Sequence, residues 1–226
     1  MVEVEIPLEL PVMTLSNVAL FPRAMVPLYI FEPRYRQMLA DVLTGDRMFI
    51  LAGQNDAEAE RSGAFEPPYP VATVGVVRAS QLNDDETSNL VIQGLVRVRI
   101  LEILQEEPYR FARVEPLPTQ PGAPETELDY RVRELISSLE ELRALNQEIP
   151  EELLDYLRAQ EEPEAVVDLA AFAFCPDPEQ KQALLAEGNV ASRFRQLLTQ
   201  LLAKRKELEL EAKLRGKMSD DDIGKN

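Results

Sequence analysis

The chain has 226 residues, of which 45% are hydrophobic and 28% are charged, a composition typical of one or two globular domains. It contains no histidine and one cysteine, Cys175, which excludes histidine-based triads and metal sites, cysteine-cluster zinc sites and an internal disulfide. The formal net charge of −16 disfavours nucleic acid as a partner, because that affinity depends on neutralising phosphates.

The start of the chain is acidic and has no basic segment, so we expect no signal peptide. No apolar run approaches the roughly 20 residues that a membrane-spanning helix needs. The expected location is therefore the cytoplasm, without membrane association. The sequence contains neither a GxxxxGK[ST] phosphate loop nor a GxGxxG turn, and we predict no cofactor and no metal.

The stretch from residue 10 to residue 39 combines prolines with apolar sequence. Because proline lacks a backbone N–H, it limits regular strand pairing and favours the rim of a small closed barrel. Val12–Leu15 and Met25–Phe31 are predicted strands, since apolar, branched and aromatic residues suit a pleated surface. Pro33 then opens a predicted helix at the first position, where its missing N–H costs nothing.

This stretch carries a resemblance to a known family. The matching residues are Leu10-Pro11, Leu20-Phe21-Pro22, Pro27-Leu28 and Ile30-Phe31-Glu32-Pro33-Arg34-Tyr35. In that order they resemble the opening of the Lon amino-terminal, substrate-binding domain, and most of all the stand-alone bacterial proteins that carry this domain alone. The resemblance implies a PUA-like barrel and a role in binding polypeptides.

Further strands follow the first helix. They are predicted at residues 47–52, 71–79, 90–104 and 109–115. Gly75 predicts a bulge or a close backbone approach, and Gly94 predicts a bend that lets its strand serve two parts of a barrel. Between the strands, residues 54–70 are polar and then proline-rich, and this pattern predicts a long loop, either an ordinary surface loop or a functional one.

The segment Pro116–Pro124 has four prolines in nine residues and predicts a domain boundary. Leucine, glutamate, alanine and arginine dominate beyond it, and helices are predicted at 125–146, 150–160, 163–174, 178–188 and 190–213. The expected fold class is α+β, with a PUA-like β-barrel followed by an α-helical bundle. The expected divisions are a barrel at 1–118, a linker at 119–124, a bundle at 125–212 and a disordered acidic tail at 213–226.

The helical half also resembles the region that follows the barrel in the Lon amino-terminal family. The matching residues are Asp168-Leu169-Ala170, Lys181-Gln182, Leu184-Leu185 and Arg193. In the full protease this region leads into an ATPase module and a Ser-Lys peptidase domain. Since the sequence contains no phosphate loop and no segment for the peptidase, we expect a protein that is not an enzyme.

Six residues are predicted to bind substrate. They are Phe21, Met25, Tyr29, Phe31, Arg34 and Tyr35. Large flexible or flat apolar side chains suit a surface that accepts many polypeptide sequences. The alternative is that most of the apolar members form the barrel core and its contact with the helix.

Three other groups have weaker patterns. Arg97 and Arg99 either line a groove for an acidic group or are solvated or paired with a neighbouring acid. Cys175 lies after an apolar helix with no base nearby, which indicates an inert thiol. Residues 84–86 are acidic, but their spacing lacks the alternating ligands of a calcium loop and indicates a solvated turn.

Three hypotheses for function follow. The leading one is a polypeptide-binding or adaptor protein that recognises exposed apolar segments of unfolded or partly folded chains, with a separate protease or ATPase as a possible partner. The second is RNA binding, because PUA-like barrels in other proteins bind RNA. The third is a hydrolase that works without ATP, for which Ser80, Ser88 or Ser192 would need a lysine; residues 1–120 contain none.

Overall fold

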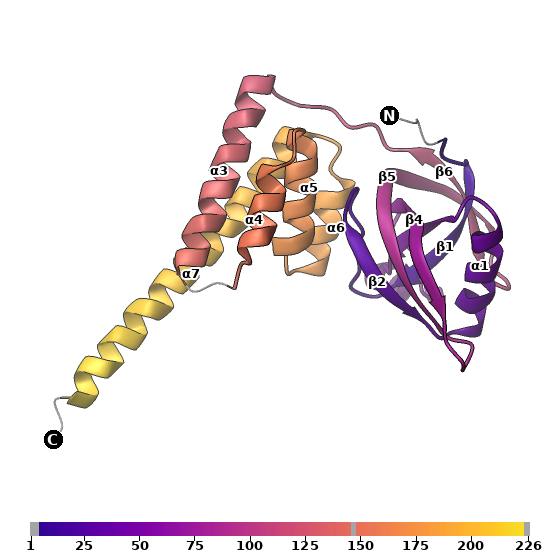
Figure 1. The fold of residues 1–226 in the computed structure, drawn as a ribbon, viewed down its shortest axis with the longest axis horizontal. Coiled ribbons are helices and arrows are strands. Elements are labelled where there is room, and N and C mark those ends of the chain that lie inside the picture. The colour runs from indigo at the N-terminus through magenta and orange to yellow at the C-terminus, as the bar shows by residue number, and fades with distance from the viewer. Residues whose placement is uncertain (1–4, 146–147, 224–226) are drawn as a thin grey trace. The chain divides into compact units, whose positions relative to one another are not determined.

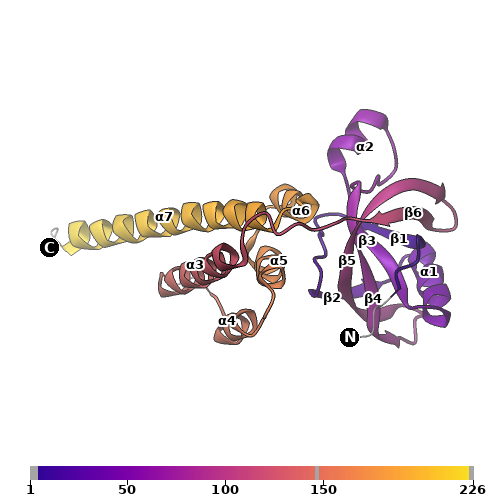
Figure 2. The same cartoon turned by 90° about the horizontal axis from the view of Figure 1, so that it is seen from above.

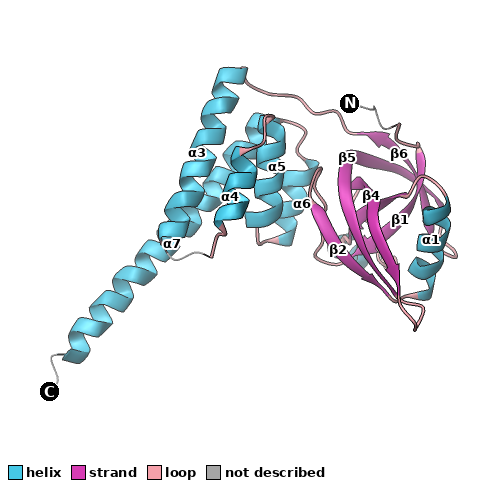
Figure 3. Ribbon diagram, in the orientation of Figure 1, coloured by secondary structure: helices cyan, strands magenta, loops and turns pink. Residues whose placement is uncertain are grey.

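The computed structural model describes residues 5–145 and 148–223, which fall into two compact units. The first, called the barrel unit, comprises Met1–Gln120 and Asp168–Gly188. The second, called the helical unit, comprises Pro121–Val167 and Asn189–Asn226. Figures 1 and 3 show the strands gathered in the barrel unit together with some of the helices, the α+β arrangement that the sequence predicts.

Six strands form the barrel unit's sheet. They are β1 (Glu9–Leu15), β2 (Met25–Ile30), β3 (Met48–Gly53), β4 (Val71–Leu82), β5 (Ser88–Gln105) and β6 (Arg110–Pro116). Their order is β2-β5-β4-β3-β1-β6, and β5 also pairs with β6, so five strands close into a ring. Only β1 and β3 pair in parallel. Strand β2 lies outside the ring and pairs with β5.

The long strand β5 changes partner at Gly94. Its first part pairs with β2, from Ser88 to Gln93, and its second part pairs with β6, from Val98 onward. This change of partner falls around Gly94, where the sequence predicts that one strand serves two parts of the sheet. A Cβ at this position would lie 2.1 Å from the carbonyl oxygen of Phe21, so only glycine allows the loop before β2 to approach this closely.

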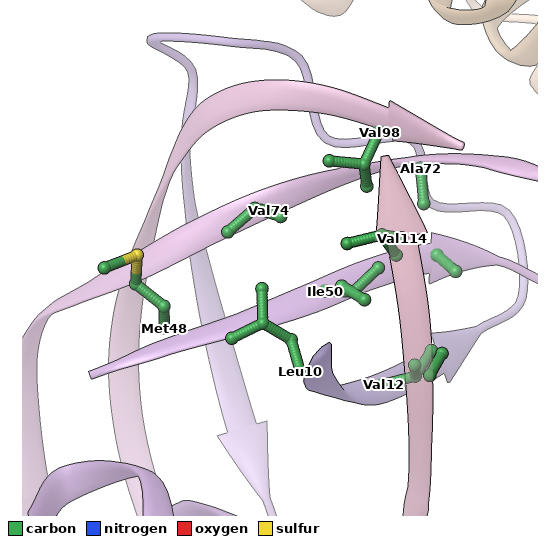
Figure 4. Close-up of a cluster of buried hydrophobic side chains, with 10 residues drawn as sticks. Leu10, Val12, Met48, Ile50, Ala72, Val74, Val98 and Val114 are labelled. Carbon is green, nitrogen blue, oxygen red and sulfur yellow. The ribbon is translucent and has the colours of Figure 1, made fainter. Parts of the chain in front are cut away.

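The barrel interior is apolar (Figure 4). Its buried cluster consists of Leu10, Val12, Met48, Ile50, Ala72, Val74, Val98, Ala112 and Val114, with Ala52 among them. Alternate residues of each strand point to one face, so strands from all around the ring contribute to a single core. The register of β4 against β5 shifts between Val74 and Gly75, next to the position where the sequence predicts a bulge. Val74 pairs with Val96 and Gly75 with Gly94, so the extra residue, Leu95, lies on β5 and not at Gly75.

Two helices precede the sheet's later strands. Helix α1 (Pro33–Thr44) begins with Pro33 at its first position and buries Tyr35, Met38, Leu39 and Val42. Helix α2 (Asp56–Ser62) lies in the segment for which the sequence predicts a loop at 54–70, and that prediction is wrong for these residues. Figure 2 shows α2 projecting between β3 and β4, and none of its residues is buried.

Helix α2 has ordinary helix signals at both ends. The side chain of Asn55 accepts a hydrogen bond from the Glu58 amide at 3.1 Å. Gly63 ends the helix in the left-handed conformation, with φ of 71°. The pattern Asn-x-x-Glu, followed by glycine at the end, is a helix signature. The prolines that follow it favour a loop, and the sequence prediction for residues 54–70 rests on them.

The remaining helices are α3 (Glu125–Ala144), α4 (Glu151–Arg158), α5 (Pro163–Phe174), α6 (Pro178–Ala186) and α7 (Val190–Ile223). The helical unit buries leucines of α3 and α4 together with Phe194, Leu197 and Leu201 of α7.

Two findings differ from the expected divisions. Residues 168–188 belong to the barrel unit rather than to one bundle over 125–212. Helix α7 continues to Ile223, where the sequence predicts a disordered tail from 213; the last three residues of that tail lie outside the described residues.

Candidate functional site

Three of the six predicted site residues form an exposed apolar surface, here called the β2 face. They are Met25 and Tyr29 of β2 and Phe31, which follows the strand; their side chains are 58%, 54% and 59% exposed. They share one face because side chains at alternate positions of a strand point the same way. The rings of Tyr29 and Phe31 stack with centroids 6.0 Å apart. Among the described strands β2 pairs with β5 alone, so its second edge has no strand partner.

Phe21 and Tyr35 lie elsewhere, and the core alternative holds for both. Phe21 is completely buried, and Tyr35 is 5% exposed. The Tyr35 hydroxyl accepts a hydrogen bond from the Thr14 amide at 3.2 Å and donates one to the Thr14 carbonyl at 3.1 Å. Burial therefore raises the pKa of Tyr35, although its backbone hydrogen bond opposes the change. Phe21 and Tyr35 therefore have almost no accessible surface to offer a polypeptide, as the core alternative predicts.

Arg34 is held by its neighbours rather than presented to a ligand. It forms ion pairs with Glu32 and Glu66, each at 2.7 Å. Its guanidinium lies over the ring of Tyr35 at 4.4 Å and over that of Phe65 at 5.3 Å. Partial burial lowers the pKa of Arg34, but the hydrogen bonds to the two glutamates outweigh it and raise the pKa overall. Arg34 thus connects the start of α1 to the segment after α2.

That segment forms one wall of a pocket of about 760 Å³. Residues lining it include Arg34, Tyr35, Phe65, Pro67, Pro68, Ile103, Tyr109 and Arg110. Arg110 donates hydrogen bonds to the backbone carbonyls of Phe65 and Glu66, which fixes this wall against β6. The residues between α2 and β4 are therefore part of a concave, largely apolar surface, and the long segment at 54–70 has a structural role there.

Arg97 does not line a groove. It is 2% exposed, and its two terminal nitrogens donate to the two carboxylate oxygens of Asp168, at 2.7 and 2.6 Å. Its Nε donates to the carbonyl of Leu185 at 2.9 Å. The paired alternative therefore holds for Arg97, and Arg99 is exposed with its Nε 3.7 Å from Glu115.

The Arg97–Asp168 pair explains why residues 168–188 belong to the barrel unit. It joins β5 to α5, and the side chain of Gln182 in α6 donates to the carbonyl of Val71 in β4 at 2.8 Å. Both contacts use residues that carry the family resemblance. The sequence marks these residues, but their pairing across 71 positions is visible only in the structure.

The remaining candidates have ordinary structural roles. Burial raises the pKa of the Cys175 thiol, outweighing the nearby Lys181, so this thiol is not activated. Hydrogen bonds from Thr87 lower the pKa of Asp85 and hold the turn between β4 and β5. Within residues 5–145 and 148–223 there is no cluster of acidic, histidine or cysteine residues suited to a metal ion. Over the same part of the chain, no helix has the length and apolar character needed to cross a membrane.

The fold is that of a Lon amino-terminal domain. The amino-terminal domain of Lon protease from the Mycobacterium avium complex matches with a TM-score of 0.67 at 17% identity, covering 85% of this chain and 97% of that one. A Lon N-terminal domain protein from Xanthomonas campestris matches with a TM-score of 0.59 at 22% identity, covering 84% and 97%. At these identities the likeness concerns the fold alone.

Sequence comparison then gives the family. The family model of the ATP-dependent protease La (LON) substrate-binding domain matches residues 9–203, and the chain belongs to this family. Lon protease of Dictyoglomus thermophilum is 26% identical over 217 residues, and Lon protease 2 of Myxococcus xanthus is 30% identical over 220. These matches cover 96% and 95% of this chain but 27% and 26% of the relatives, so the chain spans about a quarter of their length.

Proposed function

We propose that this protein is a non-enzymatic binding protein that recognises exposed apolar segments of other polypeptides through the β2 face. The observation that carries the proposal is the exposure of Met25, Tyr29 and Phe31, each more than half accessible on one side of an edge strand. Exposed clusters of large apolar side chains mark interaction surfaces. Membership of a family described as a substrate-binding domain supports a polypeptide as the ligand.

The mechanism is association without bond making or breaking. Covering one large apolar side chain contributes about 1.5–3 kcal/mol before the cost of association is subtracted. Methionine and aromatic side chains tolerate different partner shapes, because methionine is flexible and aromatic rings offer flat surfaces. An extended segment can hydrogen-bond to the backbone donors and acceptors along the unpaired edge of β2, where Pro27 has no N–H to donate.

An adaptor role, in which bound chains pass to a separate protease or ATPase, is a second part of the proposal. It rests on the family and not on a contact in this structure. The cytoplasmic location and the absence of catalysis stay predictions.

The test is a titration of fluorescently labelled, reduced and carboxymethylated lactalbumin with the full chain, at low and high salt. We expect binding that changes little with salt. Tyr29→Asp should weaken it at least about tenfold, since losing one anchor of more than 1.4 kcal/mol has this effect. Tyr130→Asp is the matched control, because Tyr130 is 56% exposed on α3, and it should leave the affinity unchanged.

The same titration with a structured RNA separates the second hypothesis. Binding to RNA that falls steeply with salt, together with no binding to lactalbumin, would overturn the proposal and favour an RNA-binding protein. Equal losses for Tyr29→Asp and Tyr130→Asp would show that the β2 face has no particular role.

A further inference from the structure

A second pocket of the barrel unit shares no residue with the β2 face. It has a volume of about 280 Å³ and is lined by residues of the β3–α2 connection, by Tyr69 and by the start of α6. Three of its lining residues are carboxylates, namely Asp56, Asp177 and Glu179, and none is lysine or arginine. Its volume is about nine times a water molecule's share of the liquid and below the usual range for small-molecule sites, which suits a single extended side chain.

The pocket is negative even when the neighbouring helix ends are counted. Asp177 caps α6 by accepting from the Gln180 amide at 2.9 Å, and Asp56 accepts from the side chain of Gln54 at 2.7 Å. A helix N-terminus carries roughly half a positive charge, so α2 and α6 together offset about one of the three carboxylates. The pKa of Tyr69 is raised, first by burial and then by the negative charges of Glu179 and Asp56. The hydroxyl of Tyr69 therefore senses both carboxylates.

An independent observation comes from Gln182, which also lines the pocket. Its side chain is 7% exposed, and its Nε2 donates to the carbonyl of Val71 at 2.8 Å. Because Nε2 is engaged, the carboxamide cannot turn over without losing this bond. Its Oε1 accepts no hydrogen bond from the part of the protein that the structure describes. A buried acceptor without a donor is unfavourable, and a ligand with an N–H group would relieve this cost.

Residue 53 is glycine, and the groups beside this acceptor pack closely around it. A Cβ on Gly53 would lie 3.4 Å from Oε1 of Gln182, 2.8 Å from the carbonyl oxygen of Val18 and 3.2 Å from the ring of Tyr69. Two oxygen acceptors and an aromatic ring therefore surround the place that any other side chain would fill. Oxygen acceptors, an aromatic ring and negative charge are features that bind a cationic N–H donor.

We propose that this pocket binds a primary ammonium group, with the carboxylates of Asp56 and Glu179 at its mouth and the Gln182 carboxamide oxygen at its floor. An ammonium has three donors and no acceptor, which matches a lining of acceptors. The group can come from a lysine side chain of a bound polypeptide or from a free amine.

The test is an NMR titration of the full chain with the peptide N-acetyl-Gly-Lys-Gly-amide, with its Nε-acetylated form, and with n-butylammonium chloride. The signals to follow are the Gly53 amide and the Gln182 side-chain carboxamide. We expect the lysine peptide to shift both signals and the acetylated peptide to shift neither. Tighter binding of the peptide than of butylammonium assigns the pocket to a polypeptide lysine, and the reverse assigns it to a free amine.

Variants localise the effect. Asp56→Asn combined with Glu179→Gln should weaken the lysine peptide at least tenfold. Asp46→Asn combined with Glu60→Gln removes the same charge at exposed positions outside the pocket and should change the affinity less than twofold. Equal losses in the two double variants would mean general attraction to an acidic protein and would overturn the proposal. Shifts produced by calcium chloride and not by the lysine peptide would overturn it in favour of a metal.

The proposal for the β2 face and the proposal for the pocket can be refuted independently of each other. Tyr29→Asp removes part of the β2 face and should leave the NMR shifts with the lysine peptide intact. The pocket double variant should leave the titration with lactalbumin intact at high salt.

Discussion

The buried pair of Arg97 and Asp168 gives the sharpest prediction. Replacing Asp168 with leucine leaves the guanidinium of Arg97 buried without its carboxylate. Breaking a buried ion pair by removing one partner costs about 3–5 kcal/mol, because the remaining charge has lost both water and partner. Both side chains here are at most 2% exposed and the pair is bidentate, so we expect a cost in this range.

The measurement is native-state hydrogen exchange of the most protected β4 and β5 amides. These amides report the stability of the barrel unit alone, whereas a single melting curve would mix the two units. Arg99→Met is the control on the same strand. Its partner Glu115 is 3.7 Å away and both are about half exposed, so the cost should stay below about 1 kcal/mol.

A double variant tests the reasoning further. Arg97→Met combined with Asp168→Leu removes both charges, and its cost should be well below the sum of the two single changes. A cost for Asp168→Leu as small as that of the exposed Arg99 pair would refute the view that this contact fastens α5 and α6 to the barrel. Strict additivity in the double variant would show that the two side chains do not depend on each other.

Two further predictions concern tyrosines. Tyr35→Phe removes a hydroxyl that satisfies the N–H and carbonyl of Thr14, so barrel stability should fall by about 1–3 kcal/mol in the same exchange measurement while the affinity for lactalbumin is unchanged. If a well-folded Tyr35→Phe variant bound lactalbumin more weakly, Tyr35 would be part of the binding surface after all. Burial, helped by a hydrogen bond to Asp41, raises the pKa of Tyr109 to about 12. Because the folded pKa lies above the ordinary value, the stabilisation from Tyr109 is complete below about pH 10 and is lost as the pH rises toward 12. A ring-carbon NMR titration should show a lower pKa in Asp41→Asn, and an unchanged value would contradict this assignment.

The strands and helices were largely predictable because local chemistry determines them. Pro33 opens α1 as expected, Asp177 caps α6 through the Gln180 amide, and Gly94 lies where β5 changes partner. Each of these effects acts within a few residues or through the absence of a side chain. Helix α2 was not predicted, although Asn55 and Gly63 are typical residues for the start and end of a helix. The helix has only seven residues, and the prolines that follow it indicate a loop.

The sequence identified the aromatic segment but could not tell which of its side chains are exposed and which are buried. Both faces of β2 are apolar, so the alternation of Met25 and Tyr29 with Val26 and Leu28 does not say which side is covered. The structure decides it, because β2 adds to the outside of a closed ring and leaves one face accessible.

The sequence by itself determined the family, the fold class and most element positions. It also excluded catalytic and metal sites that need histidine or several cysteines. Composition and local patterns carry this information. Only the tertiary structure decided which side chains share a site. Arg97 pairs with Asp168, and Gln182 donates to the carbonyl of Val71, across more than seventy positions of chain. The physical reason is that contacts of this kind depend on strand closure and on how α5 and α6 return to the barrel, and no periodicity within a single segment encodes that return.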